Sequence, residues 1–174
     1  MSMGRLWDEA KNVGLLIEAA GDIPYTIKVA GEHAQEQNRL TSGRPNIEYL
    51  GRLSTVDIAA TLSTAAVYVL PARYEPFGLS ALEAALSGCA LVLGDISSLR
   101  EIWGSNALYV QPDDPGALAA TINELMSDQS LRLVYATKAY SHAQRYTVQF
   151  GRNYLAAYHH LMHANNKFFY KATA

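Results

Sequence analysis

Residues 66–94 read AVYVLPARYEPFGLSALEAALSGCALVLG and carry the strongest indication of the fold class. Two almost wholly apolar segments, 66–70 and 90–93, are each ended by a proline or a glycine. Between them, residues 79–87 have the composition of a short helix that Gly88 closes. Apolar strands with little alternation are typical of a parallel sheet that helices cover on both faces. The stretch therefore predicts one strand–helix–strand unit of an α/β fold.

The same alternation continues on either side of this unit. Further strands are predicted at residues 25–30, 46–50 and 107–110, and helices at 13–20, 130–143 and 148–164. Such a pattern predicts a doubly wound, Rossmann-like parallel α/β sheet. We expect one domain over residues 1–164, with a helical segment from about residue 130, and a tail over residues 165–174.

Three helix starts are marked by side chains that suit capping. The pairs are Ser54 with Asp57, Ser98 with Glu101, and Asp114 with Pro115. The first two have the spacing of a capping box, and the third combines an N-cap with a proline at the first helical position. The cap also explains the acidic pair Asp113-Asp114 better than a metal site does.

Composition and charge limit the classes of function. The 174 residues suffice for one domain with its own core, since a domain averages about 150 residues. Lysine and arginine total 14 and aspartate and glutamate total 16, so the net charge of −2 argues against a nucleic-acid partner. The single cysteine, Cys89, excludes an intrachain disulfide and a thiolate zinc site, and its position before a buried strand indicates a core residue.

No segment has the pattern of a membrane span or an export signal. The purest apolar run, residues 65–70, is far shorter than the roughly 20 residues of a spanning helix. Residues 1–7 lack the apolar core of a signal peptide, and the sequence has no Asn-x-Ser/Thr sequon. We therefore expect a cytoplasmic protein, with peripheral attachment of a full-length form to the inner membrane as an alternative.

The binding site is expected in the loops at the carboxyl ends of the strands, where parallel α/β sheets bind ligands. The loop over residues 71–79 is the richest, and its glycine-containing turn before a helix offers free N–H groups to an anion. Glu75 and Glu83 flank that turn, either as acceptors for the hydroxyls of a sugar phosphate or as complements to the helix dipole. Residues 4–12, with Arg5 and Lys11, are a second candidate, or a solvated turn.

Several segments together carry a family pattern. They are GRL at residues 4–6, Lys11-Asn12 with the following LLIEA, residues 75–88, residues 95–101 and residues 110–118. In this order they resemble the C-terminal, donor-binding domain of retaining GT-B glycosyltransferases of the group 1, or family 4, type. Glu75 and Glu83 match the two glutamates of that family's E-x7-E motif. The resemblance runs from residue 4 to about residue 158, nearly the whole chain.

The resemblance implies a hexosyltransferase that takes a nucleoside diphosphate sugar, needs no metal or other cofactor, and serves polysaccharide, glycolipid or glycoconjugate synthesis. The catalytic residues are then Arg5 and Lys11, which hold the diphosphate, and Glu75, which contacts hydroxyls of the transferred sugar. The donor-binding residues are Phe77, Gly78 and Leu79, whose N–H groups reach the phosphates, and Glu83, which takes the ribose hydroxyls. The resemblance also implies a front-face reaction with retention of configuration, in which the leaving phosphate assists the incoming hydroxyl. The base of the nucleotide is expected near residues 51–53.

The chain departs from the family at its start, where only three residues precede Gly4. We expect the domain that binds an acceptor sugar, lipid or glycoconjugate to be absent. Most of the first strand, which is central in the family's order 3-2-1-4-5-6, is expected to be absent too. Exposed edges invite pairing, so a homodimer is a further expectation, and the isolated chain is expected to be inactive alone.

The alternative function is a non-catalytic binding half that needs a separate acceptor-domain chain. An epimerase or phosphorylase of the same fold is a third interpretation.

Three further features leave alternatives open. His159, His160 and His163 have a helical spacing that suits a metal ion, although surface or packing positions are favoured. Arg73 either assists a phosphate or pairs with Glu75. The short turn at residues 31–33 offers fewer contacts to a donor sugar than the family's glycine-rich loop.

Overall fold

The computed structural model describes residues 1–32 and 45–146. All its strand pairs are parallel, in two runs, β1-β2-β3 and β4-β5-β6. The strands are β1 (Ser2–Met3), β2 (Ile27–Ala30), β3 (Ile47–Gly51), β4 (Val67–Leu70), β5 (Ala90–Gly94) and β6 (Leu108–Val110). The Met1 amine donates to the Val67 carbonyl at 2.7 Å, and the Val69 N–H donates to the Met1 carbonyl at 2.8 Å. These bonds join the runs in the order 3-2-1-4-5-6 and confirm the doubly wound sheet.

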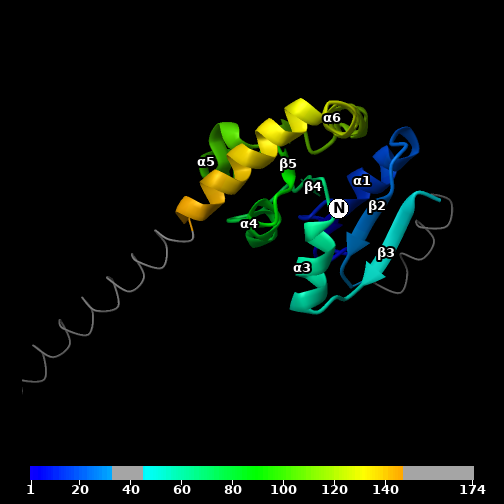
Figure 1. The fold of residues 1–174 in the computed structure, drawn as a ribbon. Coiled ribbons are helices and arrows are strands. Elements are labelled where there is room, and N and C mark those ends of the chain that lie inside the picture. Colours follow the sequence, from blue (N-terminus) through cyan, green and yellow to red (C-terminus); the bar gives the residue numbers. More distant parts are fainter. Residues whose placement is uncertain (33–44, 147–174) are drawn as a thin grey trace, which may run out of the picture.

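Helices cover both faces of the sheet (Figure 1). They are α1 (Val13–Ala19), α3 (Thr55–Ser63), α4 (Leu79–Leu86), α5 (Ser97–Trp103), α6 (Pro115–Ser127) and a helix over residues 129–146, with short 3-10 turns η1 (Ala20–Asp22) and η3 (Gly104–Asn106). On one face, α1 and α6 pack on β2, β4 and β5. On the other, α3, α4, α5 and the helix over 129–146 pack on the same central strands.

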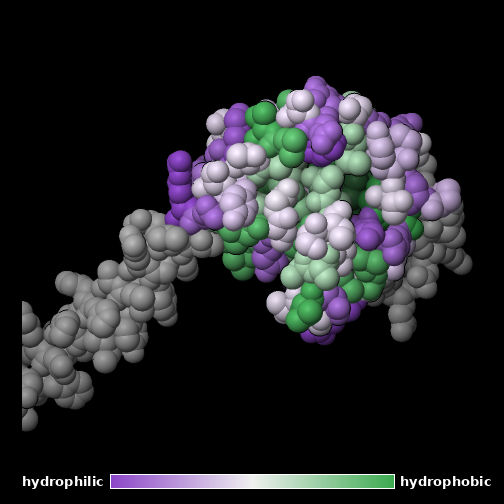
Figure 2. All heavy atoms as spheres, in the orientation of Figure 1, coloured by the Kyte–Doolittle hydropathy of each residue, from purple (hydrophilic) through white to green (hydrophobic). Residues whose placement is uncertain are grey.

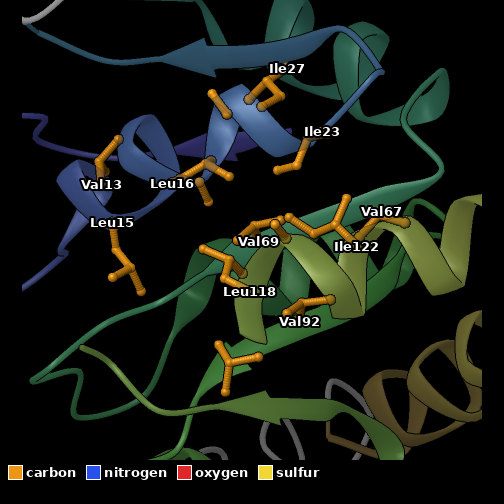
Figure 3. Close-up of a cluster of buried hydrophobic side chains, with 14 of the residues drawn as sticks. Val13, Leu15, Leu16, Ile23, Ile27, Val67, Val69, Val92, Leu118 and Ile122 are labelled. Carbon is orange, nitrogen blue, oxygen red and sulfur yellow. The ribbon is translucent and has the colours of Figure 1, made fainter. Parts of the chain in front are cut away.

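Side chains of the central strands alternate between these two cores, as the strand geometry requires. On β4, Val67 and Val69 face the α1–α6 core, whereas Tyr68 and Leu70 face the α4–α5 core. Figure 3 shows Val67 and Val69 of β4 directed toward side chains of α1 and α6. The strands β4 and β5 are thus buried and apolar on both faces, which explains their near-continuous apolar runs in the sequence. On the outer face drawn in Figure 2, apolar and polar residues are interspersed.

Two of the three predicted helix caps are present. The Ser54 side chain accepts from the Asp57 N–H at 3.2 Å, and the Asp114 side chain accepts from the Ala117 N–H at 2.8 Å. The predicted capping box of Ser98 with Glu101 is wrong, because α5 begins one residue earlier, at Ser97, after the uncapped residue Ile96. The Ser98 hydroxyl instead donates to the Glu75 carbonyl at 2.7 Å.

The start of the chain differs from the sequence-based expectation of two open edges at the centre of the sheet. Ser2 and Met3 pair with Val29 and Ala30 of β2, while Met1 bonds to β4 on its other side. Figure 1 marks this terminus between β2 and β4. The first strand is short, but over these residues it links its two neighbours. The burial of the Met1 amine lowers its pKa to about 6.

Cys89 is a core residue, as its position predicts. Its side chain is buried, and its thiol donates to the Ala65 carbonyl at 3.2 Å. Burial raises the pKa of the thiol to about 11, so that the group is protonated at neutral pH.

Among the described residues, no helix combines the length and the apolar composition needed to cross a membrane. The predicted helix over 148–164, its three histidines and the tail lie outside the described residues.

Candidate functional site

A cavity of 570 Å³ opens at the carboxyl ends of β1, β2 and β3, facing the start of α4. All seven site residues predicted from the sequence line it: Arg5, Lys11, Glu75, Phe77, Gly78, Leu79 and Glu83. Arg52 and Leu53, which follow β3, also line it, where the base is expected. The two candidate segments, residues 4–12 and 71–79, therefore form a single site.

Two glycines set the path of the loop that carries Arg5. The Gly4 N–H donates to the Ala30 carbonyl at 3.0 Å, so the loop leaves β1 directly against β2. A Cβ atom on Gly31 would lie 1.7 Å from the Gly4 carbonyl oxygen, so any other residue there forces the backbone to shift. Arg5 lines the cavity, and its guanidinium donates to Asp8 at 2.6 Å and lies 5.2 Å from the centre of the Trp7 ring.

Asn12, which follows Lys11, also shapes the site, and no role of its own is predicted for it from the sequence. Its backbone is left-handed, with φ of 54°, a conformation that asparagine tolerates better than most residues. Its side-chain amide donates to the Pro71 carbonyl at 2.9 Å and to the Pro112 carbonyl at 2.7 Å. Asn12 thereby joins the loops that follow β1, β4 and β6. The signal in the sequence that could have indicated this role is the position of the asparagine, next to a candidate lysine and just before a predicted helix.

Glu75 organises the turn before α4. One carboxylate oxygen accepts from the N–H groups of Gly78 at 2.9 Å and Phe77 at 3.3 Å, and the other pairs with Lys11. The side chain is largely buried, and burial raises its pKa. The hydrogen bonds from Lys11 and Gly78 outweigh burial and bring the pKa below its ordinary value. Glu75 is therefore ionised at neutral pH.

This arrangement changes which N–H groups are available to an anion. The N–H groups of Phe77 and Gly78, which were expected to reach the phosphates, bind Glu75. Gly78 precedes α4 in the left-handed conformation, with φ of 80° and ψ of 52°. Within the part of the chain that the structure describes, the N–H groups of Leu79 and Ser80 have no hydrogen-bond partner. These two groups at the start of α4 are the ones open to the cavity.

Of the other two charged candidates, Glu83 lies at the cavity and Arg73 lies outside it. Glu83, on the second turn of α4, is exposed at the cavity and leaves its carboxylate accessible. Arg73 does not line this cavity and does not pair with Glu75, because Lys11 occupies that carboxylate. Arg73 lies instead beside Asp8 and Glu9 in a separate surface pocket. The structure thus places Arg73 in neither of its two expected roles.

Over residues 1–32 and 45–146, no group of three or more histidine, cysteine or acidic side chains is arranged to hold a metal ion. Asp114 is engaged as the cap of α6. The cavity itself combines the cations Arg5, Lys11 and Arg52 with the anions Glu75 and Glu83. Such a mixture can bind a ligand that carries both phosphates and hydroxyl groups.

Comparison with known proteins agrees with this geometry. Glycogen synthase of Mycobacterium tuberculosis H37Rv is 36% identical over 110 residues, which cover 59% of this chain and 27% of that protein. The chain therefore spans about a quarter of this relative's length.

Solved structures show the same fold. The C-terminal domain of the group 1 glycosyltransferase LpcC from Francisella tularensis has a TM-score of 0.69 at 23% identity, with 83% of each chain covered. A crystal structure of Anabaena HepE in complex with UDP and glucose has a TM-score of 0.74 at 22% identity, covering 90% of this chain and 47% of that one. The sequence also matches the family of glycosyl transferases group 1 over residues 1–128. The chain belongs to the group 1 glycosyltransferases.

Proposed function

We propose that this chain is the donor half of a retaining group 1 glycosyltransferase, which binds a nucleoside diphosphate sugar for hexosyl transfer. The observation that carries the proposal is the cavity itself. Its lining brings together Lys11, Arg5, Glu83 and the start of α4, where the Leu79 and Ser80 N–H groups have no partner among the described residues. Anabaena HepE, of the same fold, binds UDP and glucose, which supports this class of ligand.

The proposed chemistry follows from where charge develops. Glycosyl transfer releases a nucleoside diphosphate, so negative charge grows on the phosphate side in the transition state. Lys11, Arg5 and the two N–H groups are cations and dipoles held in place before the reaction. Such preorganised donors contribute about 3–4 kcal/mol each at comparable anionic sites. The step requires no metal ion when these groups carry the charge.

In this proposal the carboxylates of Glu75 and Glu83 accept hydrogen bonds from hydroxyl groups of the donor. Glu83 is exposed on α4 and accepts from the ribose hydroxyls, while the base lies toward Arg52 and Leu53. Glu75 contacts the transferred sugar with the oxygen that now pairs with Lys11, since its other oxygen holds the Phe77 and Gly78 N–H groups. Acceptor binding and closure belong to a second domain, so we expect the isolated chain to bind donor without efficient transfer. The cytoplasmic location stays a prediction.

Calorimetric titration of the chain with UDP, GDP and ADP tests the proposal. We expect one nucleotide to bind, and Lys11→Met to weaken its binding by about 10- to 100-fold, since a charged hydrogen bond contributes about 1.5–3 kcal/mol. Glu83→Ala is expected to weaken it by about tenfold through the lost ribose contacts.

Matched controls are the exposed residues Lys138 and Glu124, which do not line the cavity. Lys138→Met and Glu124→Ala should bind the nucleotide as tightly as the unchanged chain does. A folded chain that binds none of the three nucleotides contradicts the proposal, and so does a Lys11→Met variant with full affinity.

A further inference from the structure

A second pocket lies on the loop that follows β1. It has a volume of 420 Å³ and is lined by Trp7, Asp8, Glu9, Asn12 and Arg73, together with the start of α1. We call it the loop pocket. The same loop supplies two cations to the 570 Å³ cavity, yet the two spaces share no lining residue. The loop pocket is therefore a separate space that adjoins the proposed donor site through one loop.

Hydrogen bonds hold the walls of the loop pocket in place. The Arg73 N–H donates to the Ala10 carbonyl at 2.9 Å, which joins the loop after β4 to the loop after β1. The Asp8 carboxylate accepts from the Ala10 N–H at 3.0 Å as well as from Arg5. The Asn12 amide is bonded to the loops after β4 and β6. A pocket whose walls are fixed in advance loses little affinity to ordering when a ligand binds.

Three side chains of this pocket are available to a ligand. The Trp7 side chain is 48% exposed, although a tryptophan ring is usually well buried. Glu9 and Arg73 are exposed too, and their side chains make no hydrogen bond or ion pair with other described residues. The loop pocket thus offers an aromatic ring, a hydrogen-bond acceptor and a hydrogen-bond donor.

This combination selects the chemical class of the ligand. A phosphate is disfavoured, because two carboxylates, Asp8 and Glu9, face one guanidinium, Arg73. A purely apolar ligand is disfavoured as well, because it would cover those charged groups without bonding them. A sugar ring suits all three groups, since its C–H face packs on an aromatic ring and its hydroxyls both donate and accept hydrogen bonds.

We propose that the loop pocket binds a sugar ring, which packs on Trp7 and is hydrogen-bonded by Glu9 and Arg73. It is a subsite for one ring of the saccharide to which the proposed reaction transfers, held on the donor half beside the diphosphate. Its role as an acceptor subsite rests on the proposed function, whereas the binding of a sugar ring does not. The second domain still supplies the main acceptor site.

Tryptophan fluorescence tests the proposal directly. The chain has two tryptophans, Trp7 at 48% exposure and Trp103 at 1%, so a ligand-dependent change in emission reports Trp7. The probes are maltotriose and α-mannotriose, one glucosyl and one mannosyl saccharide. We expect at least one of them to shift the emission to shorter wavelength with saturation, and Trp7→Phe to lose most of this shift.

Variants of the pocket give the second readout, in which backbone-amide NMR titration measures the affinity for the saccharide. We expect Trp7→Ala to weaken binding about tenfold through the lost aromatic surface. Glu9→Ala and Arg73→Ala should each weaken it about three- to tenfold, the effect of one hydrogen bond to a charged group. All three side chains are exposed, so the variants are expected to fold.

Tyr140→Ala and Glu18→Ala are the matched controls. Tyr140 is an exposed aromatic residue of the helix over 129–146, Glu18 is an exposed carboxylate of α1, and neither lines the loop pocket. Both variants should bind the saccharide as the unchanged chain does. An equal loss in these controls would show that the effect is not specific to the loop pocket and would overturn the proposal.

The outcomes separate the two proposals. If neither saccharide changes the Trp7 emission, or if the saccharide binds Trp7→Ala with full affinity, the sugar subsite is wrong. The proposed function fails on a different measurement, the absence of nucleotide binding by calorimetry. Saccharide binding without nucleotide binding would support the sugar site and contradict its role beside a donor.

Discussion

Glu75 holds the turn before α4 with one carboxylate oxygen and pairs with Lys11 through the other. The Ser98 hydroxyl fixes its main-chain carbonyl from α5. A single side chain therefore shapes the turn before α4 and partly neutralises Lys11. In the proposed reaction, Glu75 exchanges its Lys11 contact for a sugar hydroxyl, while its contacts to the turn persist.

The ionisation of Glu75 makes the stability of the fold depend on pH. Its pKa is lowered in the folded chain, so its contribution is present above the ordinary value of 4.5 and is lost as the pH falls through the lower, folded value. We expect Glu75→Gln to be less stable than the unchanged chain at pH 7. The difference should shrink below about pH 4.5. Urea unfolding at a series of pH values measures it, and a difference that does not change with pH contradicts this role.

At the scale of elements, α6 depends on its cap. The Asp114 side chain accepts from the Ala117 N–H, and Pro115 follows at the first helical position. We expect Asp114→Ala to destabilise the chain by about 1 kcal/mol, the usual effect of losing an N-cap. Asp113→Ala, at the exposed neighbouring position, should have little effect. Equal losses at Asp113 and Asp114 in thermal unfolding would point to a shared role for the acidic pair and against a cap.

Most elements are predictable from sequence because apolar runs and glycines mark them directly. The predicted strand at residues 90–93 is β5, Ala90–Gly94, and the predicted helix at 79–87 is α4, Leu79–Leu86. The capping box predicted for Ser98 is wrong although its spacing to Glu101 fits that motif. The tertiary contact with the Glu75 carbonyl, 23 residues away, decides its bond instead. No local pattern reports a contact of that range.

The sequence predicts which residues line the site but not which hydrogen bonds they make. Motif positions identify the residues that line the cavity, since the carboxyl ends of parallel strands converge. Sequence spacing does not show that Glu75 occupies the Phe77 and Gly78 N–H groups, while those of Leu79 and Ser80 have no partner among the described residues. That depends on the rotamer of one buried carboxylate.

At the scale of the whole molecule, β1 joins the two halves of the sheet at its centre. The close approach of Gly31 to Gly4 lets the loop after β1 turn into the cavity. We expect Gly31→Ala to destabilise the chain by about 1–3 kcal/mol, the usual range for overpacking. The loop must move, so nucleotide binding should weaken as well.

Gly14→Ala is the matched control for that prediction, because a Cβ atom there meets nothing within 4 Å and the residue lies in α1. Alanine should stabilise this helix by up to about 1 kcal/mol. Urea unfolding compares the two variants. A Gly31→Ala chain as stable as the unchanged one would show that the approach of Gly31 to Gly4 is not a constraint.

A diphosphate is proposed to bind between Lys11 and the start of α4. The most direct measurement is a backbone-amide NMR titration with the preferred nucleoside diphosphate, alongside the nucleoside alone. We expect the Leu79 and Ser80 amide signals to shift strongly with the diphosphate and little with the nucleoside. Shifts confined to other parts of the chain, or Leu79 and Ser80 signals that do not move at saturation, would contradict it.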